Sequence, residues 1–136
     1  MSWDKRATVR RMSDPPPKRS AGVYLVYLGL TPKAERRQEP EPTSLQVGDV
    51  FRLLPGKAIT IGRSRLCEVT VDAASVSSAH ALLSFMPGAE LRLALVDLDS
   101  RTGTKVEGRR SPVHYLESGG EFVVADAYRF RCQPAQ

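Results

Sequence analysis

The stretch FRLLPGKAITI (residues 51–61) places two apolar, strand-like runs on either side of a Pro-Gly turn. Short apolar runs bounded by Gly and Pro are typical of β-strands joined by tight turns. The same pattern continues downstream, where Leu93 and Leu95 alternate with Arg92 and Ala94. Because side chains of a strand alternate between two faces, this spacing predicts strands with one buried face.

Similar runs recur along the chain with turn signals about every 8–12 residues, which is typical of an antiparallel β-sandwich. The further strand-like runs are residues 23–28, 68–71, 81–85, 122–124 and 128–132. Residues 23–28 are apolar throughout, so we expect this strand to be buried on both faces. No segment shows ten residues with helical periodicity. Residues 31–42 are polar and contain three prolines, which predicts a long exposed loop.

The chain divides into three parts. Residues 1–20 are charged, contain three consecutive prolines and show no periodicity, so we expect a disordered tail. Residues 21–133 form the expected β-sandwich domain, and residues 134–136 form a C-terminal tail. The net charge is +5, and the first 20 residues hold six Lys or Arg against two acids. The basic character therefore belongs to the tail, and a nucleic-acid-binding fold is not favoured.

Composition excludes several classes of protein. Cys67 and Cys132 are too few for a disulfide framework, and we expect them to be buried, reduced thiols. With two histidines and no Cys-x-x-Cys pair, we expect neither a metal nor a cofactor. The longest apolar runs are too short to span a membrane, and the charged N-terminus does not resemble a signal peptide. We expect a cytoplasmic protein, and the absence of Asn with an excess of Arg over Lys indicates a bacterial one.

Three short segments carry turn-forming and hydroxyl residues at the ends of strand-like runs. They are residues 61–64 (IGRS), 76–81 (VSSAHA) and 99–104 (DSRTGT). Guanidinium, hydroxyl and glycine-rich backbone together are the components of a phosphate-binding surface. A Ser/His/Asp hydrolase built from Ser77, His80 and Asp99 is not favoured, because no Gly-x-Ser-x-Gly elbow is present. We expect a protein without catalytic activity.

The order of these motifs resembles the forkhead-associated (FHA) domain family. The matching features are Gly-Arg-Ser, Val-Ser-x-x-His-Ala and Asp-x-x-x-Gly-Thr-x-Val-x-Gly, followed by residues 116–124 (LESGGEFVV). The resemblance covers roughly residues 22–133. It implies an FHA-like β-sandwich of two twisted sheets, with loops at one end that bind phosphothreonine peptides.

The resemblance also assigns roles to individual residues. Arg63 matches the arginine that binds phosphate, and the planar guanidinium suits that ligand. Ser77 matches the serine whose hydroxyl and backbone N–H contact the phosphate oxygens. His80 matches a histidine that supports the loop through hydrogen bonds. Gly62 matches the glycine before the arginine, where we expect a tight backbone exit from the strand.

The remaining expected peptide contacts are Ser78, Arg101 and Thr102, with Gly103 supporting the turn into the next strand. Thr102 departs from the family, which has Asn at this position to contact the peptide backbone. A carboxamide both donates and accepts, whereas Thr has one shorter hydroxyl. Arg101 is expected either to add a second cation at the phosphate or to be a solvated loop residue.

Together these features predict a phosphothreonine-dependent binding module in Ser/Thr kinase signalling, with a kinase or its substrate as partner. The main alternative is a degenerate FHA-like scaffold that binds partners independently of phosphate. A weaker alternative is binding of nucleic acid or an anionic surface through residues 1–20. Thr8 lies in basic surroundings, so a phosphorylated tail is a further candidate ligand for the chain's own site.

Overall fold

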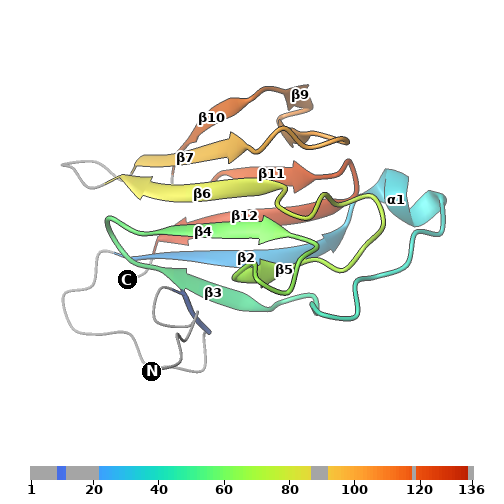
Figure 1. The fold of residues 1–136 in the computed structure, drawn as a ribbon, viewed down its shortest axis with the longest axis horizontal. Coiled ribbons are helices and arrows are strands. Elements are labelled where there is room, and N and C mark those ends of the chain that lie inside the picture. Colours follow the sequence, from blue (N-terminus) through green and yellow to red (C-terminus); the bar gives the residue numbers. More distant parts are fainter. Residues whose placement is uncertain (1–8, 12–21, 87–91, 118, 135–136) are drawn as a thin grey trace.

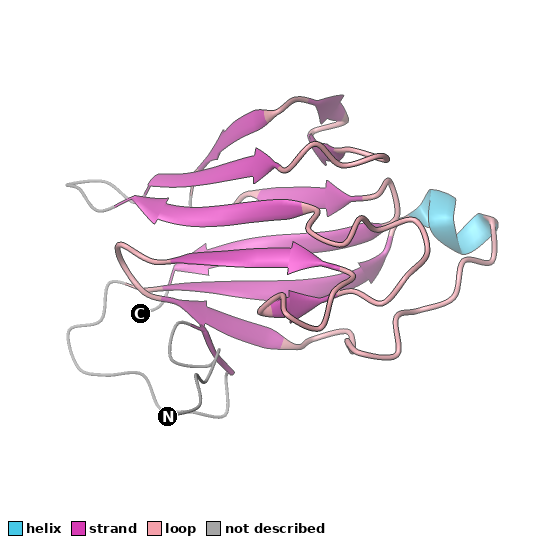
Figure 2. Cartoon of the chain, viewed as in Figure 1, coloured by secondary structure: helices cyan, strands magenta, loops and turns pink. Residues whose placement is uncertain are grey.

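The computed structural model describes residues 9–11, 22–86, 92–117 and 119–134, which form two stacked β-sheets (Figures 1 and 2). Sheet A has seven strands in the order β1 (Val9–Arg11), β3 (Val50–Leu53), β2 (Val23–Leu30), β12 (Tyr128–Pro134), β11 (Glu121–Val124), β8 (Thr104–Val106) and β9 (Arg109–Arg110). Sheet B has five strands in the order β10 (Val113–Leu116), β7 (Arg92–Asp97), β6 (Ala81–Met86), β4 (Ala58–Gly62) and β5 (Val69–Thr70). The predicted all-β sandwich is therefore confirmed.

The core lies between the inner faces of the two sheets. In sheet B, Leu83 pairs with Ile59 on one side and with Leu95 on the other, and none of the three is accessible to solvent. In sheet A, the ring of Phe130 packs 5.3 Å from Tyr27 and 5.3 Å from Phe122. Each such buried side chain contributes about 1.5–3 kcal/mol, so this alternating pattern is what holds the two sheets together.

Strand β2 is buried on one face rather than on both. Leu25 and Tyr27 face the core, whereas Tyr24 and Val26 are half-buried on the outer face of sheet A. The expectation of two buried faces was wrong because no further layer among the described residues covers this side of the strand.

One pair of strands departs from the antiparallel arrangement. Strands β4 and β5 run parallel, with Ile61 opposite Val69. The chain turns back before β5 begins, where the Cys67 amide donates to the carbonyl of Ser64 at 3.0 Å. The Val71 amide then donates to Gly62 at 2.8 Å and holds the two strands together.

The predicted loop at residues 31–42 contains a short helix, α1 (Pro32–Arg36), so the prediction was wrong for these five residues. The hydroxyl of Thr31 caps the helix by accepting from the Ala34 amide at 3.1 Å. Pro32 fits the first turn, where no amide donor is needed. Ala34 is buried, which anchors a segment too short and polar to show helical periodicity.

Three residues of the predicted N-terminal tail are described. Within residues 1–20, Val9–Arg11 form strand β1, which pairs antiparallel with β3. The other residues of this tail, including Thr8, lie outside the described residues. At the opposite end, Pro134 is the last residue of β12.

Cys67 and Cys132 are both buried and form no disulfide among the described residues, and burial raises the pKa of Cys132 to about 12. Among the described residues, α1 is the only helix, and no helix has the length and apolar character that crossing a membrane would require.

Candidate functional site

The three hydroxyl-rich segments meet at one end of the sandwich. Strands β4 and β7 end there and β6 begins there, so the loops that follow β4, precede β6 and follow β7 lie side by side (Figure 1). This arrangement follows from strand order, because β6 lies between β4 and β7 in sheet B. Residues far apart in sequence thus form one surface.

Arg63 is the first residue after β4, and its side chain is exposed. Its backbone amide donates to the carbonyl of Ser77 at 2.9 Å, and the next amide, of Ser64, donates to Ser78 at 3.1 Å. These two bonds fix the Arg63 loop against the Ser77 loop. Within the described part of the chain, the guanidinium of Arg63 forms no hydrogen bond or ion pair. The loop that contacts Ser77 therefore carries a guanidinium that is free to bind a ligand.

Gly62 has a steric role different from the one expected. Its backbone is not in the left-handed region, but a Cβ atom here would lie 2.4 Å from the carbonyl oxygen of Ser78 and 2.9 Å from Sγ of Cys67. Real Cβ atoms do not approach backbone oxygen so closely. Glycine is required because the Ser78 loop passes directly over this strand end.

Ser77 uses its backbone within the protein. Its amide donates to Nδ1 of His80 at 3.1 Å, so the expected contact between this N–H and a phosphate is not available in this conformation. Its hydroxyl oxygen accepts from the Arg101 amide at 3.1 Å, which leaves the hydroxyl hydrogen free to donate. Ser78 is exposed, and its carbonyl also accepts from Sγ of Cys67 at 3.3 Å.

His80 is buried and joins two of the loops. Because Nδ1 accepts from Ser77, the hydrogen of the neutral ring is on Nε2, which donates to the carbonyl of Gly103 at 2.7 Å. Burial lowers the pKa of His80 below its ordinary value of 6.5 and outweighs the opposing influence of Gly103. The ring is thus neutral, and its two hydrogen bonds connect the Ser77 loop to the Gly103 turn.

Arg101 and Thr102 both bind the loop between β5 and β6. Nη2 of Arg101 donates to the carbonyl of Ala74 at 3.1 Å, although the side chain is exposed. The hydroxyl of Thr102 donates to the carbonyl of Ser75 at 2.7 Å. The hydrogen of Thr102 is therefore already used within the protein, and only its oxygen lone pairs remain for a ligand.

A buried polar cluster that the motif analysis did not identify lies under these loops. One carboxylate oxygen of Asp97 accepts from the Thr104 hydroxyl at 2.7 Å, and the other accepts from the Ser100 amide at 2.9 Å. Burial raises the pKa of Asp97, but hydrogen bonds from Ser100 and Thr104 outweigh it and leave the pKa below the usual value. The Ser100 hydroxyl in turn accepts from the Gly103 amide at 2.9 Å. This cluster holds the turn that presents Arg101.

Arg110 was also missed. Its Nη2 atom donates to the carbonyls of Ser100 at 3.2 Å and Arg101 at 3.4 Å, and the side chain lies across Gly103. A Cβ atom on Gly103, where φ is +87°, would lie 2.5 Å from Nε of Arg110. Arg110 comes from strand β9, which has no strand-like signal in the sequence. It adds a further cation to the loop that carries Arg101.

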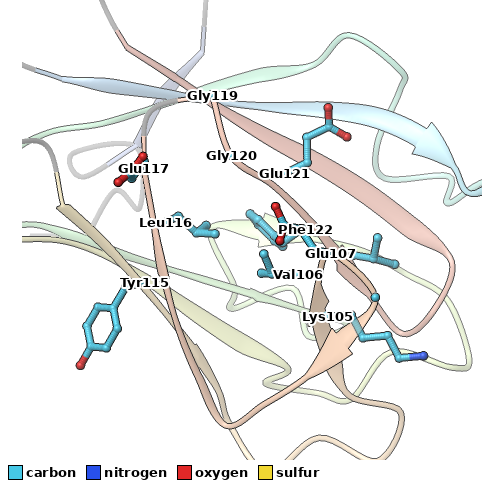
Figure 3. Close-up of a pocket in the computed structure, with 12 residues that line it drawn as sticks. Lys105, Val106, Glu107, Tyr115, Leu116, Glu117, Gly119, Gly120, Glu121 and Phe122 are labelled. Atoms are coloured by element: carbon cyan, nitrogen blue, oxygen red, sulfur yellow. The ribbon is translucent and has the colours of Figure 1, made fainter.

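Two hollows lie outside this cluster of cations. One of about 440 Å³ is lined by residues of the loop after α1 and by Asp72–Ser75, so it shares a wall with the Arg101 and Thr102 contacts. The other, of about 790 Å³, opens at the sandwich edge between β8 and β10, where Leu116 and Phe122 line it (Figure 3). Neither hollow contains Arg63, Ser77 or Arg101.

Comparison with known proteins identifies similar folds. Residues 59–125 match the model of a family described as FHA domain. The Rv1747 FHA-1 domain of Mycobacterium tuberculosis is 19% identical with a TM-score of 0.64, covering 86% of this chain and 99% of that one. The FHA domain of the CT664 protein of Chlamydia trachomatis is also 19% identical, with a TM-score of 0.66, covering 85% of this chain and 100% of its own.

The yeast Dun1 FHA domain, solved in complex with a doubly phosphorylated (pT) peptide derived from Rad53, is 23% identical. Its TM-score is 0.58, and the match covers 90% of this chain and 80% of that one. No curated protein matches the chain by sequence. At these identities the likeness establishes the β-sandwich fold alone.

Proposed function

Residues 59–125 make this chain a member of the FHA domain family, and on that premise we propose that it is a phosphothreonine-dependent protein-binding module. The phosphate lies against the guanidinium of Arg63 and the hydroxyl of Ser77. Ser78, Arg101 and Thr102 contact the peptide around it, and the protein acts by binding rather than by catalysis.

One observation carries the proposal. The backbone bond from Arg63 to Ser77 joins the loop whose guanidinium is free to the loop whose hydroxyl retains its hydrogen. The Ser77 oxygen is already an acceptor for Arg101, so its hydroxyl is oriented to donate elsewhere. An anion with several acceptor oxygens satisfies both donors, and a dianionic phosphate does so better than a carboxylate.

The expected affinity is moderate. A hydrogen bond to a charged group contributes about 1.5–3 kcal/mol, and Arg63 and Ser77 supply two or three such bonds. Ordering a flexible peptide opposes binding, so we expect a dissociation constant on the order of micromolar. An Asp or Glu in place of the phosphothreonine carries a smaller charge and fewer acceptor oxygens, and we expect it to bind poorly.

The Dun1 FHA domain, whose structure contains a phosphothreonine peptide, supports this ligand class for a fold of this kind. A phosphothreonine partner implies a Ser/Thr kinase upstream, so the partner is a kinase or one of its substrates. In contacts with the peptide beyond the phosphate, Thr102 contributes only its acceptor lone pairs, because its hydroxyl hydrogen is bonded to Ser75.

The test is isothermal titration calorimetry with a library of phosphothreonine peptides and their unphosphorylated forms. Arg63→Ala removes the free guanidinium and should reduce affinity at least tenfold, about 1.4 kcal/mol. Arg92→Ala is the matched control, since Arg92 is an exposed arginine at the start of β7, the end of that strand away from the loops. Partner binding that is equal for the wild type and Arg63→Ala would instead support a phosphate-independent scaffold.

A further inference from the structure

The outer face of sheet B is formed by two rows of side chains that the strand register brings together. The first row crosses the sheet as Val113, Val96, Leu82 and Thr60. The second row crosses it as Tyr115, Ala94, Ser84 and Ala58. None of these eight residues is charged. We call them the sheet B face.

Sheet A presents a different outer face. There Arg131 forms an ion pair with Glu121 at 2.8 Å, and Arg129 and Lys105 lie at positions on the same face. Charged side chains of both signs keep such a face in water. The eight residues of the sheet B face include no charged side chain, and the charged Arg92 lies one row beyond them.

The sheet B face is accessible. Tyr115 is 75% exposed and Val113 is 40% exposed, and Met86 beyond the second row is 42% exposed. Figure 3 shows Tyr115 pointing away from the hollow at the sandwich edge, while Leu116 points into it. Exposed apolar side chains that gather on one uncharged face indicate a protein-interaction surface.

We propose that this surface binds a second copy of the chain. The second row has one large side chain, Tyr115, at one edge of the sheet, and its other three residues, Ala94, Ser84 and Ala58, are small. A two-fold axis parallel to the strands places Tyr115 of each copy over the Ala58 end of the other, and Ala94 over Ser84. The large side chain thus fills the space above the small ones, as an isologous interface requires. A two-fold axis across the strands would place the two tyrosines against each other.

Charge favours the same pairing. The chain carries a net charge of +5, so two copies repel each other in most orientations. Contact through the sheet B face brings together two uncharged rows, with Arg92 in the next row along β7. Charged residues such as Arg92 and Glu68 lie at its rim, where they remain in water.

The size of the face sets the strength of the dimer. Four strands about 4.8 Å apart and two rows of side chains about 6.8 Å apart give about 260 Å² per copy. Two copies therefore bury about 500 Å², which is below the range of stable interfaces, so the association is weak and transient. We expect the dimer to form in the high-micromolar range.

The dimer has a consequence for binding that depends on the proposed function. An axis parallel to the strands keeps both sets of loops at the same end of the assembly. Once one phosphothreonine of a partner is bound, a second one on the same partner is held near the other copy's site at a high effective concentration. The dimer itself requires no phosphate, so its test is independent of the phosphate site.

The test is sedimentation velocity of the full chain from about 10 µM to about 1 mM, a range that spans the expected dissociation constant. The sedimentation coefficient of the wild type should rise with concentration. Ser84→Glu introduces a charge at the centre of the face and should keep the chain monomeric. Val26→Glu introduces the same charge on the outer face of sheet A and should leave the association unchanged. Thermal unfolding of both variants checks that they fold.

A second pair of variants tests the orientation. Ala58→Tyr should abolish association by occupying the space that Tyr115 of the other copy needs, and adding Tyr115→Ala to it should restore association. A wild type that stays monomeric at about 1 mM overturns the proposal. An equal effect of Ser84→Glu and Val26→Glu on association also overturns the proposal. If adding Tyr115→Ala to Ala58→Tyr does not restore association, the two-fold pairing is wrong.

Discussion

Nε2 of His80 donates to the carbonyl of Gly103 at 2.7 Å, while Nδ1 of the same ring accepts from the Ser77 amide. One buried imidazole thus joins the loop that carries Ser77 to the turn that carries Arg101. The geometry requires the neutral ring, since a protonated Nδ1 could not accept from Ser77.

Protonation of His80 should therefore destabilise the fold. Burial lowers its pKa in the folded state, so in acid the unfolded chain binds more protons. Stability should be complete above the unfolded pKa of about 6.5 and fall as the pH drops towards the folded value, by at most about 1.4 kcal/mol per unit. Urea unfolding at about pH 7 and about pH 5.5 measures this. His80→Gln should be less stable overall and lack this slope, whereas a wild type of equal stability at both pH values would contradict the assignment.

Gly62→Ala should damage the site through sterics alone. The added methyl group overlaps the Ser78 carbonyl, and overpacking of this kind costs about 1–3 kcal/mol. Relief requires the Ser77 loop to move, so phosphopeptide affinity should fall at least tenfold in calorimetry. Gly56→Ala is the control, because its φ of +76° costs about 1–2 kcal/mol while nothing lies near the new methyl. Unchanged affinity in Gly62→Ala would show that the close approach has no effect on binding.

Thr102→Asn should strengthen peptide binding. A carboxamide at this position can donate to Ser75, as Thr102 does, and also accept from or donate to a peptide backbone. One additional hydrogen bond is worth about 1 kcal/mol, or roughly a fivefold gain in affinity. Titration with the same phosphopeptide checks it, with Thr102→Val as the control that removes the bond to Ser75. A weaker Asn variant would show that the side chain cannot serve both partners.

Glu107→Asn should stabilise the domain without changing peptide binding. Glu107 has φ of 51° and precedes Gly108 in the turn between β8 and β9. Asn-Gly is strongly preferred in two-residue hairpin turns of this kind, because Asn tolerates positive φ better than Glu. We expect a gain of about 0.5–1 kcal/mol in the free energy of unfolding, measured by urea denaturation. Loss of stability would mean that the Glu107 side chain makes a contact worth more than this strain.

The strands that could be predicted are those with strong alternation. Residues 58–61, 81–85 and 128–132 lie within β4, β6 and β12 because their inward side chains are large and apolar. Strands β8, β9 and β10 were not identified individually. Strand β9 has two exposed residues, and in β10 only Leu116 is buried, so neither shows an inner face in the sequence. Helix α1 depends on one buried alanine and a cap, which leave no periodicity.

In the candidate site, too, some features could be predicted from the sequence and others could not. Gly62, Arg63, Ser77 and His80 were identifiable because they occur in short local patterns beside strand ends. The hydrogen bonds from the Ser77 amide to His80 and from the Thr102 hydroxyl to Ser75 could not be predicted from the sequence. Each of these bonds depends on the packed position of a loop, and Thr102 and Ser75 are 27 residues apart in the chain.

The sequence alone determined the alternation of the strands and the residue types at the strand ends, because both are local properties of the chain. Only the tertiary structure decided how those residues are used. Arg110 reaches the Arg101 turn from another strand, and the sheet B face joins residues from β4, β6, β7 and β10. Hydrogen bonds and surface patches depend on distances in space, and these are set only when strands remote in sequence pair in register.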